Sequence, residues 1–170
     1  LDQLEALDDT IVAFFHDNGP NGNRWNGDME GRKGSTEEGG TRSPLLIKWP
    51  KGIKAGTKVM QIASVRDLLP TLCELAGVED KPDKPLDGKS LKPLLLGDEK
   101  GWKPRTLVST WKGKLGVREP RFRLGYKGRL FDMEQDPGQR VDVSKKFPKV
   151  VERLNKRKDF FQRKVLDKVR

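Results

Sequence analysis

Apolar residues form two short continuous runs in the first third of the chain. Residues 10–15 read Thr-Ile-Val-Ala-Phe-Phe, and residues 44–49 read Pro-Leu-Leu-Ile-Lys-Trp. An unbroken run of β-branched and aromatic residues is typical of a strand that is buried on both faces, as in a parallel sheet. The pattern predicts a strand in each run, the first buried in a parallel α/β sheet whose other strands come from elsewhere, and residues 2–8 predict the end of a preceding helix.

The segment between these runs has a different character. Residues 16–43 contain seven glycines, at positions 19, 22, 27, 31, 34, 39 and 40, and almost no aliphatic side chains. Loops of this length are uncommon in a compact domain and are usually functional or disordered. We therefore expect a long loop that carries chemistry.

Residues 67–77 have the pattern of a capped helix. Asp67 is a favourable N-cap, Pro70 falls in the first turn, and Gly77 suits the position just after the last turn. Within this helix Cys73 is expected to be a small buried side chain. A further one or two helical turns are predicted within residues 90–96.

After residue 100 the apolar residues fall into shorter groups. Four strand-like runs, at 106–111, 114–118, 122–127 and 129–133, are separated by Gly or Pro. Their spacing predicts an antiparallel meander. Residues 147–165 then place apolar side chains on one face of a long basic helix, with Pro148 near its start.

Charge is distributed unevenly along the 170 residues. Lys and Arg number 35 and Asp and Glu 25, which gives +10 overall. Residues 1–100 hold 14 basic and 17 acidic residues (−3), and residues 101–170 hold 21 and 8 (+13). The C-terminal part is therefore suited to an anionic partner such as a sulfated polymer, although a merely solvated surface is the alternative.

The composition argues against several classes of protein and of metal site. No apolar run approaches 18 residues, so we expect no membrane span, and no recognised nucleic-acid-binding motif accompanies the basic charge. The single cysteine excludes an internal disulfide, and the single histidine, His16, excludes a His-rich metal site made by this chain alone.

The loop supplies the candidate chemical groups. Asp17 and Asn18 directly follow the first predicted strand and offer oxygen donors of the kind that calcium or magnesium prefers, while Asp-Asn-Gly is also a common turn. Lys33 and Arg42 are suited to face an oxyanion. The Gly-x-x-x-x-Gly-Lys-Ser/Thr spacing of a phosphate-binding P-loop is not present.

Taken in order, these motifs resemble the sulfatase family. Asp-Asn-Gly at 17–19 is followed at 31–44 by Gly-Arg-Lys-Gly-Ser-Thr-Glu-Glu-Gly-Gly-Thr-Arg-Ser-Pro, where the family reads Gly-Lys-Gly-Thr-Thr-Tyr-Glu-Gly-Gly-x-Arg-x-Pro. Residues 67–77 are similar to the family's Asp-Leu-x-Pro-Thr-Leu-x-x-Leu-Ala-Gly. Leu-Asp-Gly-Lys-Ser-Leu at 86–91 and Leu-Phe-Asp-Met-Glu-Gln-Asp-Pro at 130–137 continue the match.

The resemblance implies a fold, a reaction and a set of site residues. Sulfatases hydrolyse sulfate esters on an alkaline-phosphatase-like α/β fold, with a formylglycine nucleophile made from a Cys/Ser-x-Pro-x-Arg motif and with a calcium ion. By position in the motif, Asp17 and Asn18 would be metal ligands and Lys33 would contact the sulfate. A fixed cation stabilises charge that develops on the leaving oxygen. The family also suggests a secreted or periplasmic location.

Parts of the family pattern are missing. The chain contains no Cys/Ser-x-Pro-x-Arg, and the family's N-terminal Asp pair and upstream Lys and His are absent too. We therefore expect the C-terminal part of a sulfatase, inactive alone, whose formylglycine lies in a missing N-terminal part. Residues 1–100 would belong to the catalytic α/β domain, and residues 101–170 would form a small basic subdomain with an antiparallel sheet and a C-terminal helix.

Three further residues are candidates for contacts with the substrate, a sulfate ester that we expect to include sulfated carbohydrate. His16 stands where the family usually has a small hydroxyl residue, and Arg24 and Trp25 lie in the variable part of the loop. Stacking and ion pairing would suit a sugar or aryl group. The alternative function is a non-catalytic fragment that binds sulfated or other anionic polymers through its basic C-terminal face.

Overall fold

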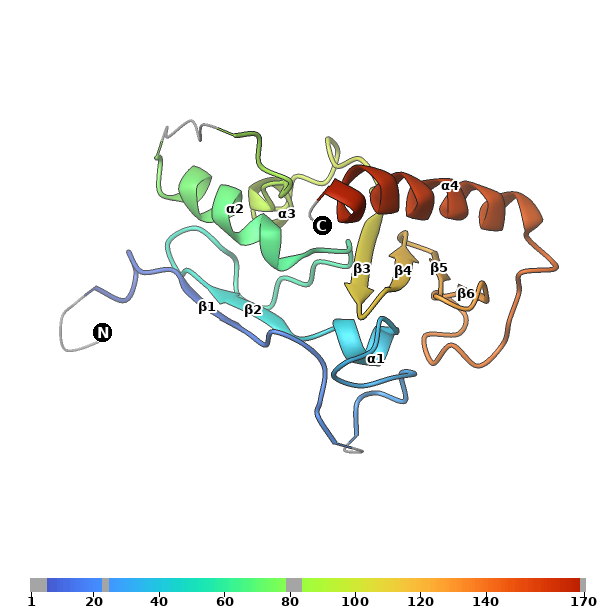
Figure 1. Cartoon of the computed structure of the whole chain (residues 1–170). Coiled ribbons are helices and arrows are strands. Elements are labelled where there is room, and N and C mark those ends of the chain that lie inside the picture. The colour runs from blue at the N-terminus through green and yellow to red at the C-terminus, as the bar shows by residue number, and fades with distance from the viewer. Residues whose placement is uncertain (1–5, 23–24, 79–83, 169–170) are drawn as a thin grey trace. The chain divides into compact units, whose positions relative to one another are not determined.

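A computed structural model describes residues 6–22, 25–78 and 84–168 (Figure 1). The chain forms two compact units. The first combines residues 1–15 with residues 44–104, and the second combines residues 16–43 with residues 105–170. The long loop thus packs with the C-terminal segment rather than with the strands on either side of it. A domain boundary near residue 100 stays a prediction.

The first unit contains a two-stranded antiparallel sheet. Strand β1 (Val12–Phe15) pairs with β2 (Leu45–Lys48), with Phe14 opposite Leu46. Both strands were expected. Within the described part of this chain β1 pairs only antiparallel with β2 and is not doubly buried, because Phe14 is 53% exposed and Leu46 63% exposed. The strands expected to cover it were to come from elsewhere. An apolar run shows that a strand is suited to burial, and it does not identify the segment that would cover it. The expected helix end at residues 2–8 lies mostly outside the described residues.

The capped helix is present with a different start. A 3-10 turn, η2 (Val65–Asp67), leads into α2 (Leu68–Leu75). Asp67 does not cap α2 with its side chain. Its carboxylate is buried and accepts hydrogen bonds from the backbone N–H of Ser64, at 2.6 Å, and of Lys89, at 2.9 Å. The residue therefore closes the preceding turn and fixes the segment that leads to α3 (Lys92–Leu95).

Two details of the helical region agree with expectation or refine it. Gly77 adopts the left-handed conformation, with a φ of 69°, directly after the helix, as its position predicted. Cys73 is a free cysteine and is only half-buried.

The second unit is built on a four-stranded antiparallel meander. Its strands, in sheet order, are β3 (Leu107–Trp111), β4 (Lys114–Arg118), β5 (Phe122–Leu124) and β6 (Leu130–Asp132). The long helix α4 (Pro148–Lys164) lies across one face and is followed by the 3-10 turn η3 (Leu166–Lys168) (Figure 1). The predicted meander and C-terminal helix are both confirmed.

Alternation along the strands gives this sheet two different faces. On one face Val117, Leu124 and Leu130 are fully buried together with Leu154 of α4, and they form the hydrophobic core. The opposite face of β4 and β5 presents Arg118 and Arg123, which are cross-strand partners. A sheet with one apolar and one charged face needs a polar partner for the second face, and the loop supplies it.

The loop itself is more ordered than its composition predicted. It contains a single helical turn, α1 (Glu38–Thr41), whose first three residues are buried. Among the helices of the described residues, none combines the length and the apolar character that a membrane crossing requires.

Candidate active-site loop

Backbone hydrogen bonds draw the separate motifs of residues 16–43 together. Gly19 N–H donates to the carbonyl of Gly40, and Lys33 N–H donates to the carbonyl of Pro20, each at 3.0 Å. At the base of the loop the hydroxyl of Ser43 donates to the carbonyl of His16 at 2.8 Å. The Asp-Asn-Gly turn, the lysine segment and the glycine pair are therefore neighbours in space, although they are spread over 24 residues.

Close backbone approach explains one of the glycines in this arrangement. A Cβ atom on Gly19 would collide with the carbonyl oxygen of Gly39. Any side chain at position 19 would push the Asp-Asn-Gly turn away from α1. The packing of the turn against the helix thus depends on this residue type.

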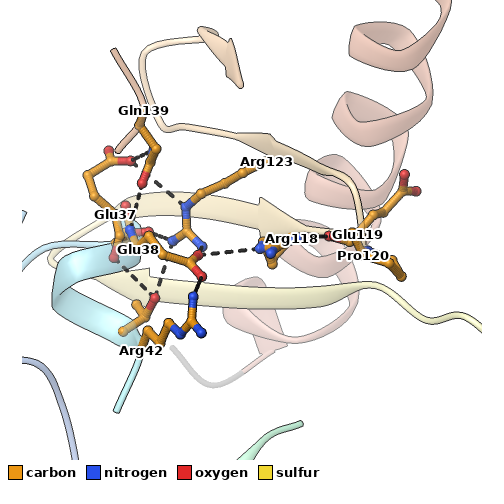
Figure 2. Close-up of polar contacts among 10 residues, drawn as sticks. Glu37, Glu38, Arg42, Arg118, Glu119, Pro120, Arg123 and Gln139 are labelled. Carbon is orange, nitrogen blue, oxygen red and sulfur yellow. Dashed lines mark hydrogen bonds and ion pairs between the residues drawn. The ribbon is translucent and has the colours of Figure 1, made fainter. Parts of the chain in front are cut away.

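A buried arginine holds the loop against the sheet. The guanidinium of Arg123, on β5, is 2% exposed and donates to the Glu38 carboxylate at 2.9 Å (Figure 2). It also donates to the backbone carbonyl of Thr36 and lies 4.0 Å from the Glu37 carboxylate. One side chain therefore contacts three consecutive residues of the loop.

Arg118, on β4, strengthens this contact. Its Nε lies 3.3 Å from the same Glu38 oxygen that Arg123 contacts (Figure 2). Burial lowers the pKa of both guanidinium groups, and the Glu38 carboxylate opposes that shift. Since arginine stays protonated in proteins, the cluster joins one buried and one half-buried cation to two buried carboxylates.

Gln139 completes the cluster from a separate segment of the chain. Its amide oxygen accepts from the backbone N–H of Glu38 at 2.8 Å, and its amide nitrogen donates to the Glu37 carboxylate at 3.0 Å. The side chain is buried, and the backbone adopts a φ of 57°. Glutamine fits this place because its amide offers both an acceptor and a donor.

The far part of the loop contacts the C-terminal segment of the same unit as well. Arg129 donates to Glu30 at 2.9 Å. The indole of Trp111, at the end of β3, lies against Gly34, since its Nε1 is 3.5 Å from where a Cβ of that glycine would be. Gly34 itself adopts a φ of 83°, which favours glycine. The segment around Lys33 is thus held on both sides.

The predicted site residues occupy different environments on this frame. Asp17 and Lys33 are exposed and Asn18 is half-buried, so all three can reach a ligand. His16 is exposed, and its carbonyl closes the base of the loop. Trp25 is 86% exposed, whereas Arg24 lies outside the described residues.

The described residues do not make up a complete metal site. Among residues 6–22, 25–78 and 84–168 there is no group of three or more His, Cys, Asp or Glu side chains that could hold an ion. Asp17 and Asn18 have the oxygen donors that calcium prefers, but calcium takes six to eight oxygen ligands. These two residues are suited to be part of a site whose other ligands come from elsewhere.

The residues that fix the loop were not singled out in the sequence. A signal was available in β4 and β5, where Arg118 and Arg123 interrupt runs of core residues with a charge. A buried arginine requires a carboxylate partner. The adjacent Glu37 and Glu38, which precede the glycine pair, were the candidates for that partner.

Comparisons with known proteins follow the same segments. A family model described as Sulfatase matches residues 1–78, which include the loop. Bovine arylsulfatase A is 45% identical over 178 aligned residues, covering 82% of this chain and 34% of the relative. The chain belongs to the sulfatase family. It spans between 17% and 34% of the length of the curated relatives that it matches.

Solved structures extend the likeness to almost the whole chain. The structure of Ps i-CgsB in complex with k-i-k-neocarrahexaose superimposes with a TM-score of 0.82 and 30% identity, over 94% of this chain and 38% of that one. BT4656 in complex with its substrate, D-glucosamine-2-N,6-O-disulfate, gives a TM-score of 0.68 and 25% identity, over 98% and 37%. The alkaline-phosphatase-like sulfatase fold expected from the motifs is confirmed, with its small antiparallel sheet and C-terminal helix.

Proposed function

We propose that this chain forms one wall of the active site of an enzyme that hydrolyses sulfate esters, with a sulfated carbohydrate as the substrate class. The observation that carries the proposal is the convergence of Lys33 with the Asp-Asn-Gly turn through the Lys33–Pro20 and Gly19–Gly40 backbone bonds. A second support is that BT4656, a structural relative, has a sulfated glucosamine as its substrate.

Each residue has a role that suits its chemistry. The exposed ammonium of Lys33 binds the sulfate group and stabilises the negative charge that develops on the leaving oxygen. Asp17 and Asn18 would provide two oxygen ligands for a calcium ion, which would orient the sulfate and withdraw charge from it. The formylglycine nucleophile would come from a Cys/Ser-x-Pro-x-Arg motif upstream of this sequence.

The proposal is tested on the native protein that contains these 170 residues. Intact mass and peptide sequencing upstream of Leu1 should show a longer chain with a Cys/Ser-x-Pro-x-Arg motif in its formylglycine form. That protein should release sulfate from sulfated sugars, whereas the pure 170-residue chain should release none, because it has no nucleophile. A native mass near 19.3 kDa, or sulfate release by the pure chain, contradicts the proposal.

Variants of the native protein separate the two roles. Lys33→Ala should lower kcat by about 100-fold or more, the usual effect of removing one group that stabilises transition-state charge. The matched control is Lys145→Ala, an exposed lysine before α4, which should leave the rate unchanged. Asp17→Ala should weaken calcium binding measured directly by titration calorimetry, and unchanged binding would remove Asp17 from the ligand set.

The alternative, a non-catalytic binder of anionic polymers, predicts a different pattern. In that case neutralising Lys156, Arg157 and Lys158 of α4 should abolish binding of a sulfated polymer, and Asp17→Ala should leave it intact.

A further inference from the structure

The tip of the β3–β4 hairpin carries an exposed aromatic and basic surface beside Lys33. Trp111 is the last residue of β3, and its side chain is 48% exposed. Its indole lies against Gly34, the residue that directly follows Lys33. A large aromatic ring at the surface, next to a candidate sulfate-binding lysine, offers an apolar face on which a ring of the ligand can stack.

The hairpin turn fixes the orientation of this ring. Lys112 and Gly113 have φ values of 47° and 77°, the left-handed pair of a tight two-residue turn. Trp111 and Lys114 are directly opposite each other in the register and so project from the same face of the hairpin. The backbone therefore holds the Trp111 ring and the Lys114 side chain side by side.

Further cations surround the aromatic groups. The ammonium of Lys112 lies 6.0 Å from the centre of the Trp111 ring. Lys114 and Lys127 place their ammonium groups 4.8 Å and 5.6 Å from the centre of the Tyr126 ring. We define these residues, Trp111, Lys112, Lys114, Tyr126 and Lys127, as the hairpin ledge.

One carboxylate close to the hairpin ledge is already engaged. Glu37 lies about 3.5 Å from where a Cβ of Gly125 would be, next to Tyr126, but its oxygen accepts from Gln139 and pairs with Arg123. The Glu37 carboxylate therefore neutralises little of the positive charge that the lysines of the hairpin ledge present to a ligand. A ligand that combines an apolar ring face with anionic groups matches this surface.

We propose that the hairpin ledge binds a ring of a sulfated oligosaccharide next to the ester that Lys33 contacts. The C–H face of the sugar stacks on the Trp111 indole, and sulfate groups on the ring pair with Lys112 and Lys114. This inference rests on the proposed function for the neighbouring site, and it assigns a substrate-recognition role to the C-terminal sheet.

Binding measurements on the 170-residue chain test the hairpin ledge without requiring turnover. The probes are dextran sulfate, unsulfated dextran, and polyvinyl sulfate, which has the charge but no sugar ring. Trp111→Ala should weaken dextran sulfate binding by about tenfold, a change of about 1.4 kcal/mol, and should alter polyvinyl sulfate binding by less than about twofold. Trp111→Phe should restore most of the affinity.

Control variants distinguish the hairpin ledge from the basic helix. The Lys112→Ala/Lys114→Ala pair should weaken binding of both sulfated polymers, more so at low salt. Lys156→Ala/Lys158→Ala removes the same number of charges from α4, and Phe160→Ala removes an exposed aromatic ring from that helix. Both should leave dextran sulfate binding within about twofold of the starting value.

Each outcome has a distinct meaning. Unchanged dextran sulfate affinity in Trp111→Ala overturns the proposal, and so does an equal loss for both polymers. A larger loss in the α4 lysine variant also overturns it, in favour of the basic helix. Ring-specific binding, together with a native protein containing this chain that releases no sulfate, would retain the hairpin ledge and reject the proposed function. Sulfate release by that native protein with an inert hairpin ledge would do the reverse.

Discussion

The Arg123 guanidinium donates a hydrogen bond of 2.9 Å to the Glu38 carboxylate, and both side chains are buried. The two residues are 85 positions apart in the sequence. Their contact joins the loop that carries Lys33 to the polar face of the C-terminal sheet. The sheet thus uses one face for its hydrophobic core and the other to hold the candidate active-site loop.

Replacing Arg123 should lower the stability of the protein. Arg123→Met leaves the Glu38 carboxylate buried without its closest cation, so the free energy of unfolding should fall by about 3–5 kcal/mol in urea titrations. The control Arg153→Met removes an exposed pair with Glu119 and should cost about 1 kcal/mol or less. Equal costs in the two variants would show that the buried pair does not hold the loop. In a double-mutant cycle, Glu38→Gln should recover part of the loss.

Gln139 provides a test of the same cluster that depends on pH. Gln139→Glu places a second carboxylate beside Glu37, where the amide nitrogen now lies at 3.0 Å. Repulsion raises the pKa of the new carboxyl in the folded state, so its ionisation destabilises the protein as the pH rises through the normal range of glutamate. We expect a loss of about 1–3 kcal/mol at pH 7 that shrinks below about pH 4. A deficit that is independent of pH would contradict the charge repulsion.

The helix on the other face should behave as a packing element. Leu154→Ala opens a cavity between α4 and the sheet, where Leu154 is fully buried, and should lower the free energy of unfolding by about 3 kcal/mol. Phe160 is on the same helix but 59% exposed, and Phe160→Ala should change it by less than about 0.5 kcal/mol. Thermal unfolding measures the loss of stability in each variant. A larger loss for Phe160→Ala than for Leu154→Ala would show that the core does not lie at Leu154.

The contact between Asp132, on β6, and Arg121 should be sensitive to acid. Its hydrogen bond from the Arg121 guanidinium, at 2.7 Å, lowers the pKa of the carboxyl below the ordinary value of 3.8. A lowered carboxyl pKa adds stability that is complete above the unfolded-state value and is lost as the pH falls through the folded-state value. The wild type should therefore exceed Arg121→Met in stability at pH 7 and match it near pH 2, with the difference disappearing below about pH 4. If the difference in stability persists at pH 2, it comes from packing of the Arg121 side chain and not from the charge of Asp132.

The sequence predicted the local elements better than their surroundings. The meander at β3–β6 and the helix α4 follow directly from alternation and from the 3.6-residue period. The antiparallel pairing of β1 with β2 did not follow, because a run such as Ile-Val-Ala-Phe-Phe indicates affinity for a core and not which strand pairs with it. In the same way Asp67 was correctly expected at a helix start, while its bond to Lys89 depends on a segment 22 residues away.

In the candidate site, too, the sequence predicted local motifs but not the tertiary contacts that position them. Residues 17–19 and Lys33 were found by motif, since their order and types match the family. The residues that position them were not, because Arg123 and Gln139 meet the loop only through tertiary contacts between segments about 100 positions apart. A charge inside an apolar strand is a local sign of such a contact, but it does not name the partner.

The most direct test of this account is amide hydrogen exchange of the 170-residue chain and its Glu38→Gln variant. The substitution keeps the shape of the side chain and removes the charge that Arg123 and Arg118 contact. We expect faster exchange at the amides of Gly19 and Lys33, whose hydrogen bonds join the loop segments, with unchanged protection in β4 and β5. Unchanged exchange at Gly19 and Lys33 would contradict the claim that the C-terminal sheet holds the candidate active-site loop in place.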